Sequence, residues 1–323
     1  MLYYIKKIMR NGKATKTFYS RLRKLRDDRV HKERIKGKYQ FDGRSNGCNR
    51  MCMILAGYKE VVWEDVFGRI KKYIPEDVDF CIVTSGMIND KLRKLAKKNN
   101  WSYLSTQRNC VTLAQNIAIS LFPQAKYIYK LDEDIFINEG FYEILWNTYN
   151  RVQEESFYNI GFVAPLIPIN GFAYTEVLKC LGLMDKYREL FQEPCISAEG
   201  SNPVVCNPEV AKFFWGKGGY VPKIDEINRQ LRVKPFDYTV CPIRFSIGAI
   251  MFPRETWEDM GYFKVEAGNC LGLDEIQLCE FCVSSSRVMI VSKNCCVGHM
   301  SFGPQNNEMI EYYKENRECF KSE

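Results

Sequence analysis

The chain has 323 residues, of which 46% are hydrophobic and 14 are cysteines, and its net charge is +7. This length and composition suit one large domain or two with a proper core, and they argue against a disordered protein. No run approaches the roughly 18 apolar residues of a membrane span, and residues 1–10 lack the apolar centre of a signal peptide. We therefore expect a cytosolic protein whose cysteines are reduced thiols rather than a disulfide framework.

The positive charge is concentrated in residues 1–50, which carry 16 Lys and Arg against four acidic residues, whereas the remainder carries 30 against 35. Phe18, Leu22 and Leu25 follow helical spacing between basic residues, which predicts one or two basic amphipathic helices. Residues 1–35 are thus expected to bind an anionic membrane surface; packing on the domain and binding of nucleic acid are the alternatives. The Gly- and Asn-rich residues 37–49 predict a linker, so that residues 1–48 form a separate segment.

A regular alternation of strands and helices follows this segment. Apolar runs predict strands at 51–56, 79–84, 101–105 and 127–132, and helical periodicity predicts helices between them. Strands that alternate with helices are joined by right-handed crossovers and form a mostly parallel sheet. The sequence therefore predicts an α/β fold with helices flanking the sheet.

The fourth predicted strand ends in the acidic motif Asp132-Glu133-Asp134. Open α/β sheets bind ligands at the carboxyl ends of their strands, and carboxylates two residues apart can bind one hard cation. The motif is thus a candidate metal and ligand site, with a solvated acidic turn as the alternative.

Several short motifs follow one another along the chain in a fixed order. They are Ala56-Gly57-Tyr58, Arg108-Asn109, Ala114-Gln115-Asn116, Asp132-Glu133-Asp134, Gly248 to Arg254, Trp257, Gly261-Tyr262-Phe263 and Asp274 to Leu278. In order and spacing these motifs resemble those of the nucleotide-sugar glycosyltransferases of the GT-A fold, particularly the inverting family 2 type. The resemblance covers residues 49–164 and 243–303 and departs from the family at two places. Gln115 replaces a basic residue, and Asp274-Glu275 reverses the family's Glu-Asp pair.

The resemblance implies a GT-A-like domain that transfers a sugar from a nucleoside-diphosphate sugar, a UDP-sugar in many relatives, to a glycan or lipid-linked glycan. Residues 49–164 would bind the donor, the insertion 165–242 would form the acceptor region, and residues 243–323 would carry the catalytic half and the C-terminal tail. Inversion is the expected outcome, with a retaining transferase or a sugar-nucleotide nucleotidyltransferase as alternatives. A nucleic-acid-binding protein without enzymatic activity is the least favoured interpretation.

The same resemblance implies a donor site and a metal site. Mn²⁺ or Mg²⁺ would be bound by Asp134, by Asp132 directly or through water or the ribose, and by His299, whose imidazole favours Mn²⁺. For His299 the alternative is a histidine hydrogen-bonded in a turn. Glu133 would point away or orient its neighbours. The residues assigned to donor binding are Ala56, Tyr58, Asp79, Asn109, Asp132 and Glu133.

An inverting transferase also needs a general base for the acceptor hydroxyl. Asp274 and Glu275 follow the Gly-rich residues 268–272 at the start of a predicted helix, and either acid is a candidate. That helix is expected to bury Ile276, Leu278 and Phe281. Glu258-Asp259 precedes the Gly261-Tyr262-Phe263 turn, whereas the family's acid pair follows it, so we expect an exposed helix face there.

Two further patterns have simpler explanations than the functional ones. Trp215 and Tyr220 lie beside three glycines and predict either a mobile lid that stacks on sugar or a loop with two anchoring aromatic residues. Cys279-x-x-Cys282 with Cys295-Cys296 loosely resembles a zinc spacing, but the first pair falls in an apolar helix, which favours buried thiols.

Overall fold

The computed structural model describes residues 25, 28–300 and 303–322, and residues 28–34 are helical. The strands are β1 (Tyr39–Asp42), β2 (Arg50–Leu55), β3 (Val78–Ser85), β4 (Ser102–Thr106), β5 (Tyr127–Asp132), β6 (Ile135–Phe136), β7 (Ile160–Leu166), β8 (Tyr238–Val240), β9 (Ala249–Pro253), β10 (Val288–Cys296) and β11 (Gly298–His299). The α-helices are α3 (Trp63–Tyr73), α4 (Asp90–Lys98), α5 (Val111–Leu121), α6 (Phe141–Glu155), α7 (Ala173–Leu181), α8 (Met184–Leu190), α9 (Pro203–Cys206), α10 (Pro208–Phe214), α11 (Ile224–Arg232), α12 (Arg254–Asp259), α13 (Leu273–Ser284) and α14 (Asn306–Glu315). Short 3₁₀ helices are η1 (Glu60–Val62), η2 (Lys217–Gly219), η3 (Gly303–Gln305) and η4 (Arg317–Cys319).

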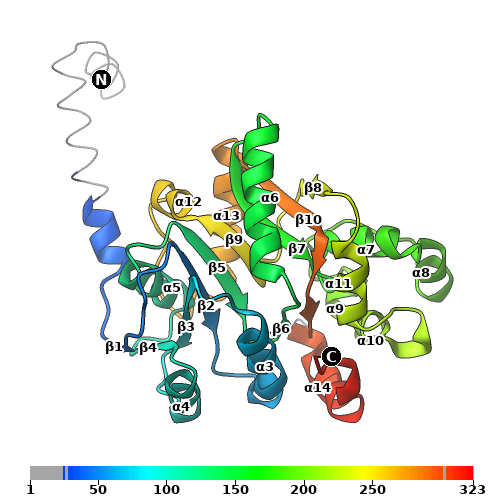
Figure 1. Ribbon diagram of the computed structural model, residues 1–323, viewed down its shortest axis with the longest axis horizontal. Coiled ribbons are helices and arrows are strands. Elements are labelled where there is room, and N and C mark those ends of the chain that lie inside the picture. The colour runs from blue at the N-terminus through cyan, green and yellow to red at the C-terminus, as the bar shows by residue number, and fades with distance from the viewer. Residues whose placement is uncertain (1–24, 26–27, 301–302, 323) are drawn as a thin grey trace.

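Within the described residues, one sheet of nine strands crosses the molecule in the order β1-β4-β3-β2-β5-β9-β7-β10-β8 (Figure 1). The β4-β3-β2-β5 block is parallel, and β10 pairs in parallel with β7. Only β9 and the two edge strands run against this direction. The predicted α/β class, a mostly parallel sheet flanked by helices, is therefore confirmed.

The strands predicted from apolar runs correspond to β2, β3, β4 and β5, and α3, α4 and α5 connect them. The segment expected to be a linker differs, because it contains edge strand β1, which pairs antiparallel with β4. Residues 45–48 then fold around the Asp79 carboxylate, which accepts hydrogen bonds from the Ser45 hydroxyl and from the backbone N–H groups of Asn46 and Cys48. This stretch is therefore part of the folded domain.

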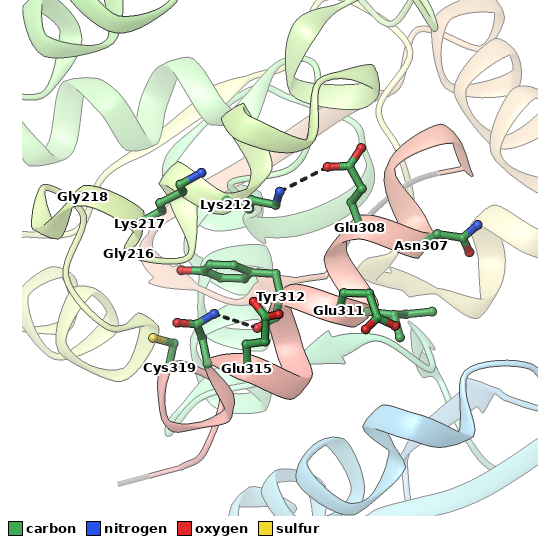
Figure 2. Close-up of a pocket in the computed structure, with 12 residues that line it drawn as sticks. Lys212, Gly216, Lys217, Gly218, Asn307, Glu308, Glu311, Tyr312, Glu315 and Cys319 are labelled. Carbon is green, nitrogen blue, oxygen red and sulfur yellow. Dashed lines mark hydrogen bonds and ion pairs between the residues drawn. The ribbon is translucent and has the colours of Figure 1, made fainter.

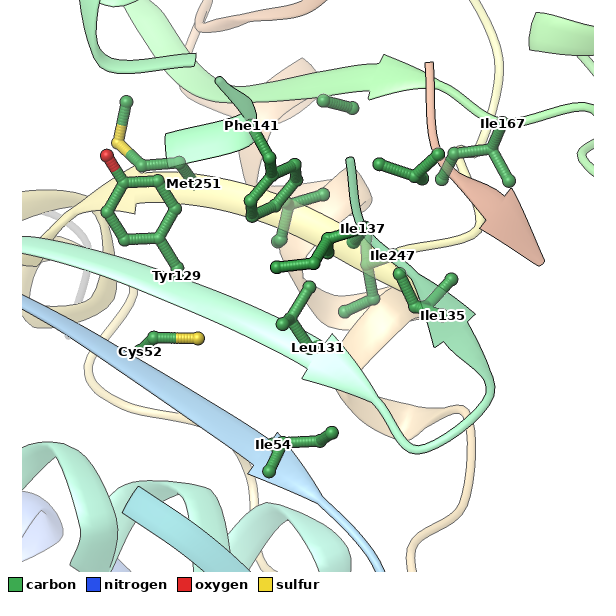
Figure 3. Close-up of a cluster of buried hydrophobic side chains, with 14 of the residues drawn as sticks. Cys52, Ile54, Tyr129, Leu131, Ile135, Ile137, Phe141, Ile167, Ile247 and Met251 are labelled. Carbon is green, nitrogen blue, oxygen red and sulfur yellow. The ribbon is translucent and has the colours of Figure 1, made fainter. Parts of the chain in front are cut away.

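The core beneath the acidic motif is contributed by strands that lie side by side at the centre of the sheet. Figure 3 shows Ile54 of β2 next to Leu131 of β5, Met251 of β9 farther back along the sheet, and Ile135 and Ile137 beyond the motif. All five side chains are fully buried. Packing on both sides of the motif fixes where the chain leaves β5 and so where the carboxylates are placed.

Little of the basic N-terminal segment can be compared with its prediction, because Phe18 and Leu22 lie outside the described residues. The part that is described packs on the domain. The His31 ring stacks on Tyr262 at 4.2 Å between centroids, and Arg34 donates to the carbonyl oxygens of Gly261 and Tyr262. The Asn116 amide also donates to the Arg34 carbonyl at 3.0 Å. In the described part of the chain no helix has both the length and the apolar character that crossing a bilayer requires.

About half of the segment 165–242 is helical, and of its two glycine-flanked aromatic residues Trp215 is an anchor rather than part of a lid. Trp215 is buried, stacks on Phe320 at 4.0 Å, and donates from its indole nitrogen to the His299 carbonyl at 3.0 Å. A Cβ atom at Gly298 would lie 2.3 Å from the indole, so this close packing requires glycine. The anchoring alternative is correct for Trp215, whereas Tyr220 is partly exposed.

Candidate functional site

The acidic motif lies where β5 ends and the chain turns into the short strand β6. The backbone N–H of Asp132 donates to the Gly248 carbonyl, which fixes the end of β5 against the β9 side of the sheet. β6 then pairs antiparallel with β11, so that Ile135 lies opposite His299. The Met300 N–H also donates to the Asp134 carbonyl at 3.1 Å. This two-stranded antiparallel ladder therefore brings His299 next to Asp134, although 165 residues separate them in the sequence.

Glu133 braces the loop that follows β2. Its carboxylate accepts hydrogen bonds from the backbone N–H of Gly57 at 3.0 Å, from that of Tyr58 at 2.9 Å and from the Trp63 indole at 2.6 Å. The side chain is buried, and both of its oxygens are engaged by this loop. Its position matches the expectation that Glu133 orients its neighbours, and it leaves no place for the direct donor contact that was also predicted.

Asp134 is buried beside a lysine and a histidine. The Lys59 ammonium lies 2.6 Å from Oδ2 of Asp134, and Nε2 of His299 lies 3.4 Å from the same oxygen. Burial alone would raise the pKa of Asp134, but the positive charges of protonated His299 and of Lys59 hold that pKa below its ordinary range. Asp134 is thus an ionised carboxylate that attracts cations.

The hydrogen bonds of His299 fix the tautomer of its ring. Nδ1 lies 3.2 Å from the carbonyl oxygen of Ile169, and because a carbonyl can only accept, Nδ1 must carry the hydrogen. In a neutral ring, the lone pair of Nε2 would then face the Asp134 carboxylate. Nε2 of such a ring and Oδ2 of Asp134 are both acceptors, and at 3.4 Å they repel each other unless a proton or a metal cation lies between them. Metal-binding histidines commonly make this kind of carbonyl contact through their second nitrogen.

Asp132, at the end of β5, belongs to a second charged cluster. Its carboxylate is partly exposed and accepts from the buried Lys130 ammonium at 2.6 Å, which also donates to the Ile247 carbonyl at 2.9 Å. A Cβ atom at position 248 would lie 3.2 Å from Cδ1 of Ile135 and 3.4 Å from Oδ2 of Asp132, so Gly248 packs closely against the acidic motif. Within the described residues, no three His, Cys, Asp or Glu side chains converge as a metal cluster. The predicted ligand set of Asp132, Asp134 and His299 is therefore not assembled in advance, although two of its members are adjacent.

The two candidate bases at the start of α13 differ in their surroundings. Asp274 is buried and accepts from the Gln115 amide at 2.8 Å, which gives a role to the residue that replaces the family's basic one. Glu275 is partly exposed, and Arg244 Nε lies 3.4 Å from its carboxylate. Burial raises the pKa of Glu275 and the charge of Arg244 opposes this, with smaller effects from Asp274, Lys130 and Asp132. Glu275 is thus the more accessible of the two.

The other predicted donor residues fall at two different edges of the sheet. Ala56 and Tyr58 follow β2 beside Glu133, and Asn109 is exposed in the loop after β4, packed against Gly86. Asp79 lies at the beginning of β3, opposite Met51 in the pairing with β2, and therefore at the amino edge. Since its carboxylate holds residues 45–48, the structure does not bring Asp79 to the site.

Sequence reasoning missed Lys59, Lys130 and Arg244, which supply the cationic partners of the acids. Lys59 and Asp134 are separated by 75 residues, and no local pattern links them. Lys130 gave a usable signal, because a lysine inside an apolar strand needs a buried partner. In α13, the expected burial of Ile276 is wrong: the side chain is exposed, and Phe281 is only partly buried.

A groove of about 850 Å³ opens elsewhere, between α10, η2 and α14. Figure 2 shows Lys212 directed at Glu308 across it, with Tyr312 on the groove wall. Lys212 also pairs with Glu209 at 2.9 Å, so its charge is compensated. None of the candidate site residues lines this groove, and its size alone does not make it the active site.

All cysteines of the chain are free thiols, as predicted, and Cys279 and Cys282 are buried in α13. Burial raises the pKa of each to about 12. These values and the absence of a described metal cluster favour the interpretation as buried thiols over a zinc site.

Comparison with known proteins gives little beyond the fold. No protein-family model matches the chain, and no curated protein matches it. Among solved structures, the chain is similar to the crystal structure of GalNAc-T7 with UDP, GalNAc and Mn²⁺, with 12% identity, a TM-score of 0.45 and coverage of 85% of this chain and 52% of that one. It is also similar to the mannosyltransferase PcManGT from Pyrobaculum calidifontis in complex with GDP-Man and Mn²⁺, with 14% identity, a TM-score of 0.43 and coverage of 85% and 63%. The chain thus spans less than two thirds of either structure.

Proposed function

We propose that this chain is a metal-dependent glycosyltransferase of the GT-A type, which transfers a sugar from a nucleoside-diphosphate sugar, such as a UDP-sugar, to a hydroxyl group of a glycan or lipid-linked glycan. The observation that carries the proposal is the contact between Asp134 and His299. The ring is held so that Nε2 faces Oδ2 of the carboxylate at 3.4 Å, while Nδ1 contacts a carbonyl. A divalent cation between these two groups would satisfy both.

The donor set fits such a cation in chemical type. One carboxylate and one imidazole suit Mn²⁺ better than Mg²⁺, and the remaining positions would be filled by the donor's diphosphate and by water. When bound, the cation would neutralise negative charge on the leaving diphosphate. Lys59, which pairs with Oδ2 of Asp134, would then compete with the cation or turn to the phosphates.

The chain's own residues would divide the remaining work. The Asp132 side chain is partly exposed, so its carboxylate is available to the donor's ribose or to a metal-bound water. Glu133 would keep the loop after β2 in place through its three donors, which presents Tyr58, exposed at 66%, to the nucleotide base.

We assign the general base to Glu275. An acceptor hydroxyl must lose its proton as the new bond forms, and the base must be both deprotonated and within reach. Glu275 is partly exposed and burial raises its pKa, which favours proton uptake, whereas Asp274 is buried and harder for an acceptor to reach. Asp274, bonded to Gln115, would position the start of α13. A base on the acceptor side corresponds to inversion.

The test is release of nucleoside diphosphate from UDP- and GDP-sugars with and without Mn²⁺, in the wild type and in Asp134→Asn and Glu275→Gln. Glu258→Gln on the exposed face of α12 is the matched control. Loss of turnover in the first two variants with an unchanged control supports the assignment. Full turnover in Asp134→Asn would overturn the metal site, and full turnover in Glu275→Gln would overturn the base.

A peripheral position at an anionic membrane surface is part of the same proposal. The described residues 28–34 pack on the turn after α12, and the more basic part of the segment precedes them. Removal of residues 1–24, which retains these contacts, should weaken sedimentation with anionic vesicles but leave transfer to a soluble acceptor unchanged. Unchanged sedimentation would refute the membrane role.

A further inference from the structure

Two cysteines far apart in the sequence meet beside the start of α13. The sulfur atoms of Cys110 and Cys270 lie 3.2 Å apart, and 160 residues separate them. Both residues are buried, and both are free thiols. A disulfide bond requires about 2 Å between its sulfurs, so a movement of about 1 Å would close this pair.

The two cysteines belong to elements of different mobility. Cys110 is the N-cap residue of α5, and its backbone N–H donates to the Ser85 hydroxyl at 2.7 Å. Cys270 is the buried residue of an otherwise exposed loop, in which residues 266–269 and Leu271 face solvent. Its φ of 55° lies in the left-handed region, and the loop has glycines with φ of 84° and 77° at positions 268 and 272. The loop can therefore supply the movement, whereas α5 supplies a fixed partner.

The surroundings of the pair assign different roles to the two thiols. Burial raises the pKa of the Cys110 thiol, and the Thr112 hydroxyl, 3.4 Å from its sulfur, opposes this increase. Cys110 is thus poorly suited to react first with a reagent from solution. Cys270 lies on the loop that solvent reaches, so opening of this loop would expose its sulfur first.

We propose that Cys110 and Cys270 form an oxidisable dithiol site that reacts with the disulfide of a small thiol. The thiolate of Cys270 attacks one sulfur of the small disulfide, which releases one small thiolate and leaves a mixed disulfide on the loop. Cys110, after losing its proton, attacks the Cys270 sulfur and displaces the second small thiolate. The two protein thiols lose two electrons and two protons in total, and the small disulfide is reduced to two thiols.

Closure of this disulfide would fix the loop before α13 to the start of α5. The backbone already joins them, because Val111 N–H donates to the Asn269 carbonyl at 2.8 Å. Asp274 and Glu275 begin α13 directly after this loop, and Gln115 of α5 holds Asp274. The dithiol therefore controls how firmly the two acids are attached to the sheet, and this conclusion does not depend on the reaction that they perform.

The test uses the full chain, reduced and freed of reductant, and incubated with oxidised or with reduced glutathione. Free thiols are then alkylated under denaturing conditions and the peptides are identified by mass spectrometry. After oxidation, the Cys110 and Cys270 peptides should be joined, both of these thiols should be protected from alkylation, and a reductant should reverse both changes. Cys279 and Cys282, buried in the same helix that follows the loop, are the internal control and should remain reduced.

Two variants separate the roles of the thiols. Cys110→Ser places a favourable N-cap residue at the start of α5, so it should fold, and it should trap Cys270 as a stable mixed disulfide with glutathione. Cys270→Ser should leave Cys110 unmodified. Three results would overturn the proposal: a mixed disulfide that persists on Cys270 in the wild type, a disulfide that joins Cys110 or Cys270 to another cysteine, or full alkylation of Cys270 after oxidation. Because the assay uses neither metal nor nucleotide, its failure would leave the glycosyltransferase assignment untouched.

Discussion

Substitution of Glu133 by glutamine tests whether the middle acid of the motif is a brace rather than a ligand. The change keeps the size of the side chain but replaces one acceptor oxygen with an NH₂ donor. In the wild type, Oε2 accepts from Gly57 and from the Trp63 indole, and Oε1 accepts from Tyr58. Whichever way the glutamine amide is oriented, at least one of these donors would face another donor.

The expected loss of stability follows from these contacts. A hydrogen bond to a charged group contributes about 1.5–3 kcal/mol, and a neutral one about half as much. Glutamine removes at least one charge-assisted bond and weakens the others in a buried position. We therefore expect the free energy of unfolding to fall by about 2–4 kcal/mol, which corresponds to a decrease in Tm of about 3–6 °C for a chain of this length.

The assay is urea and thermal unfolding of the wild type and of Glu133→Gln, with Glu258→Gln as the exposed control. The control should lie within about 0.5 kcal/mol of the wild type. If the account is correct, Glu133→Gln still shows Mn²⁺-dependent stabilisation by nucleotide, although from a lower starting Tm. Unchanged stability together with loss of the Mn²⁺ dependence would refute the reasoning and make Glu133 a ligand.

The remaining predictions concern the cationic partners of the acids. Lys59→Met should lower the free energy of unfolding by about 2 kcal/mol without metal, because Asp134 loses a buried ion pair. Saturating Mn²⁺ should narrow this difference between the variant and the wild type. A difference that Mn²⁺ leaves unchanged would contradict the account in which Lys59 and the cation share Asp134. Arg244→Gln removes the charge that opposes the raised pKa of Glu275, so that pKa should rise further. The acid limb of the pH profile of kcat/KM should therefore move to higher pH. An acid limb that stays in place would exclude Glu275 as the base. Arg34→Ala should lower the free energy of unfolding in urea by about 1–2 kcal/mol, because two carbonyls in the turn after α12 lose their donor. An unchanged unfolding midpoint would show that this contact is dispensable.

The parts of the fold that follow from local pattern were predictable. Apolar runs such as residues 51–55 and 127–131 must be buried, and their alternation with helices sets the class of the sheet. β1 was missed although Tyr39-Gln40-Phe41-Asp42 alternates apolar and polar residues, because the run is only four residues long and stands next to Gly43. An edge strand is held by backbone pairing with one neighbour, and such pairing leaves little trace in so short a sequence.

The candidate site shows the same division between local and long-range information. Asp132 and Asp134 are placed by the end of one strand, which a sequence can indicate. The contact of Asp134 with His299 depends on the long-range pairing of β6 with β11. The role of Trp215 depends on its packing against Gly298. Asp79 was misassigned although it begins the predicted strand 79–84, because the start of a parallel strand lies at the amino edge of the sheet, where residues 45–48 fold around this carboxylate.

The most direct test of the central claim is the Tm of the purified protein against a panel of nucleoside diphosphates, each with and without Mn²⁺, in the wild type and in Asp134→Asn. A ligand that binds the folded state at 100 times its Kd stabilises it by about 2.7 kcal/mol, which is readily measured. The account predicts a Tm increase for one class of nucleotide that requires Mn²⁺ and disappears in Asp134→Asn. A flat panel in the wild type, or an increase that persists in Asp134→Asn, would contradict it.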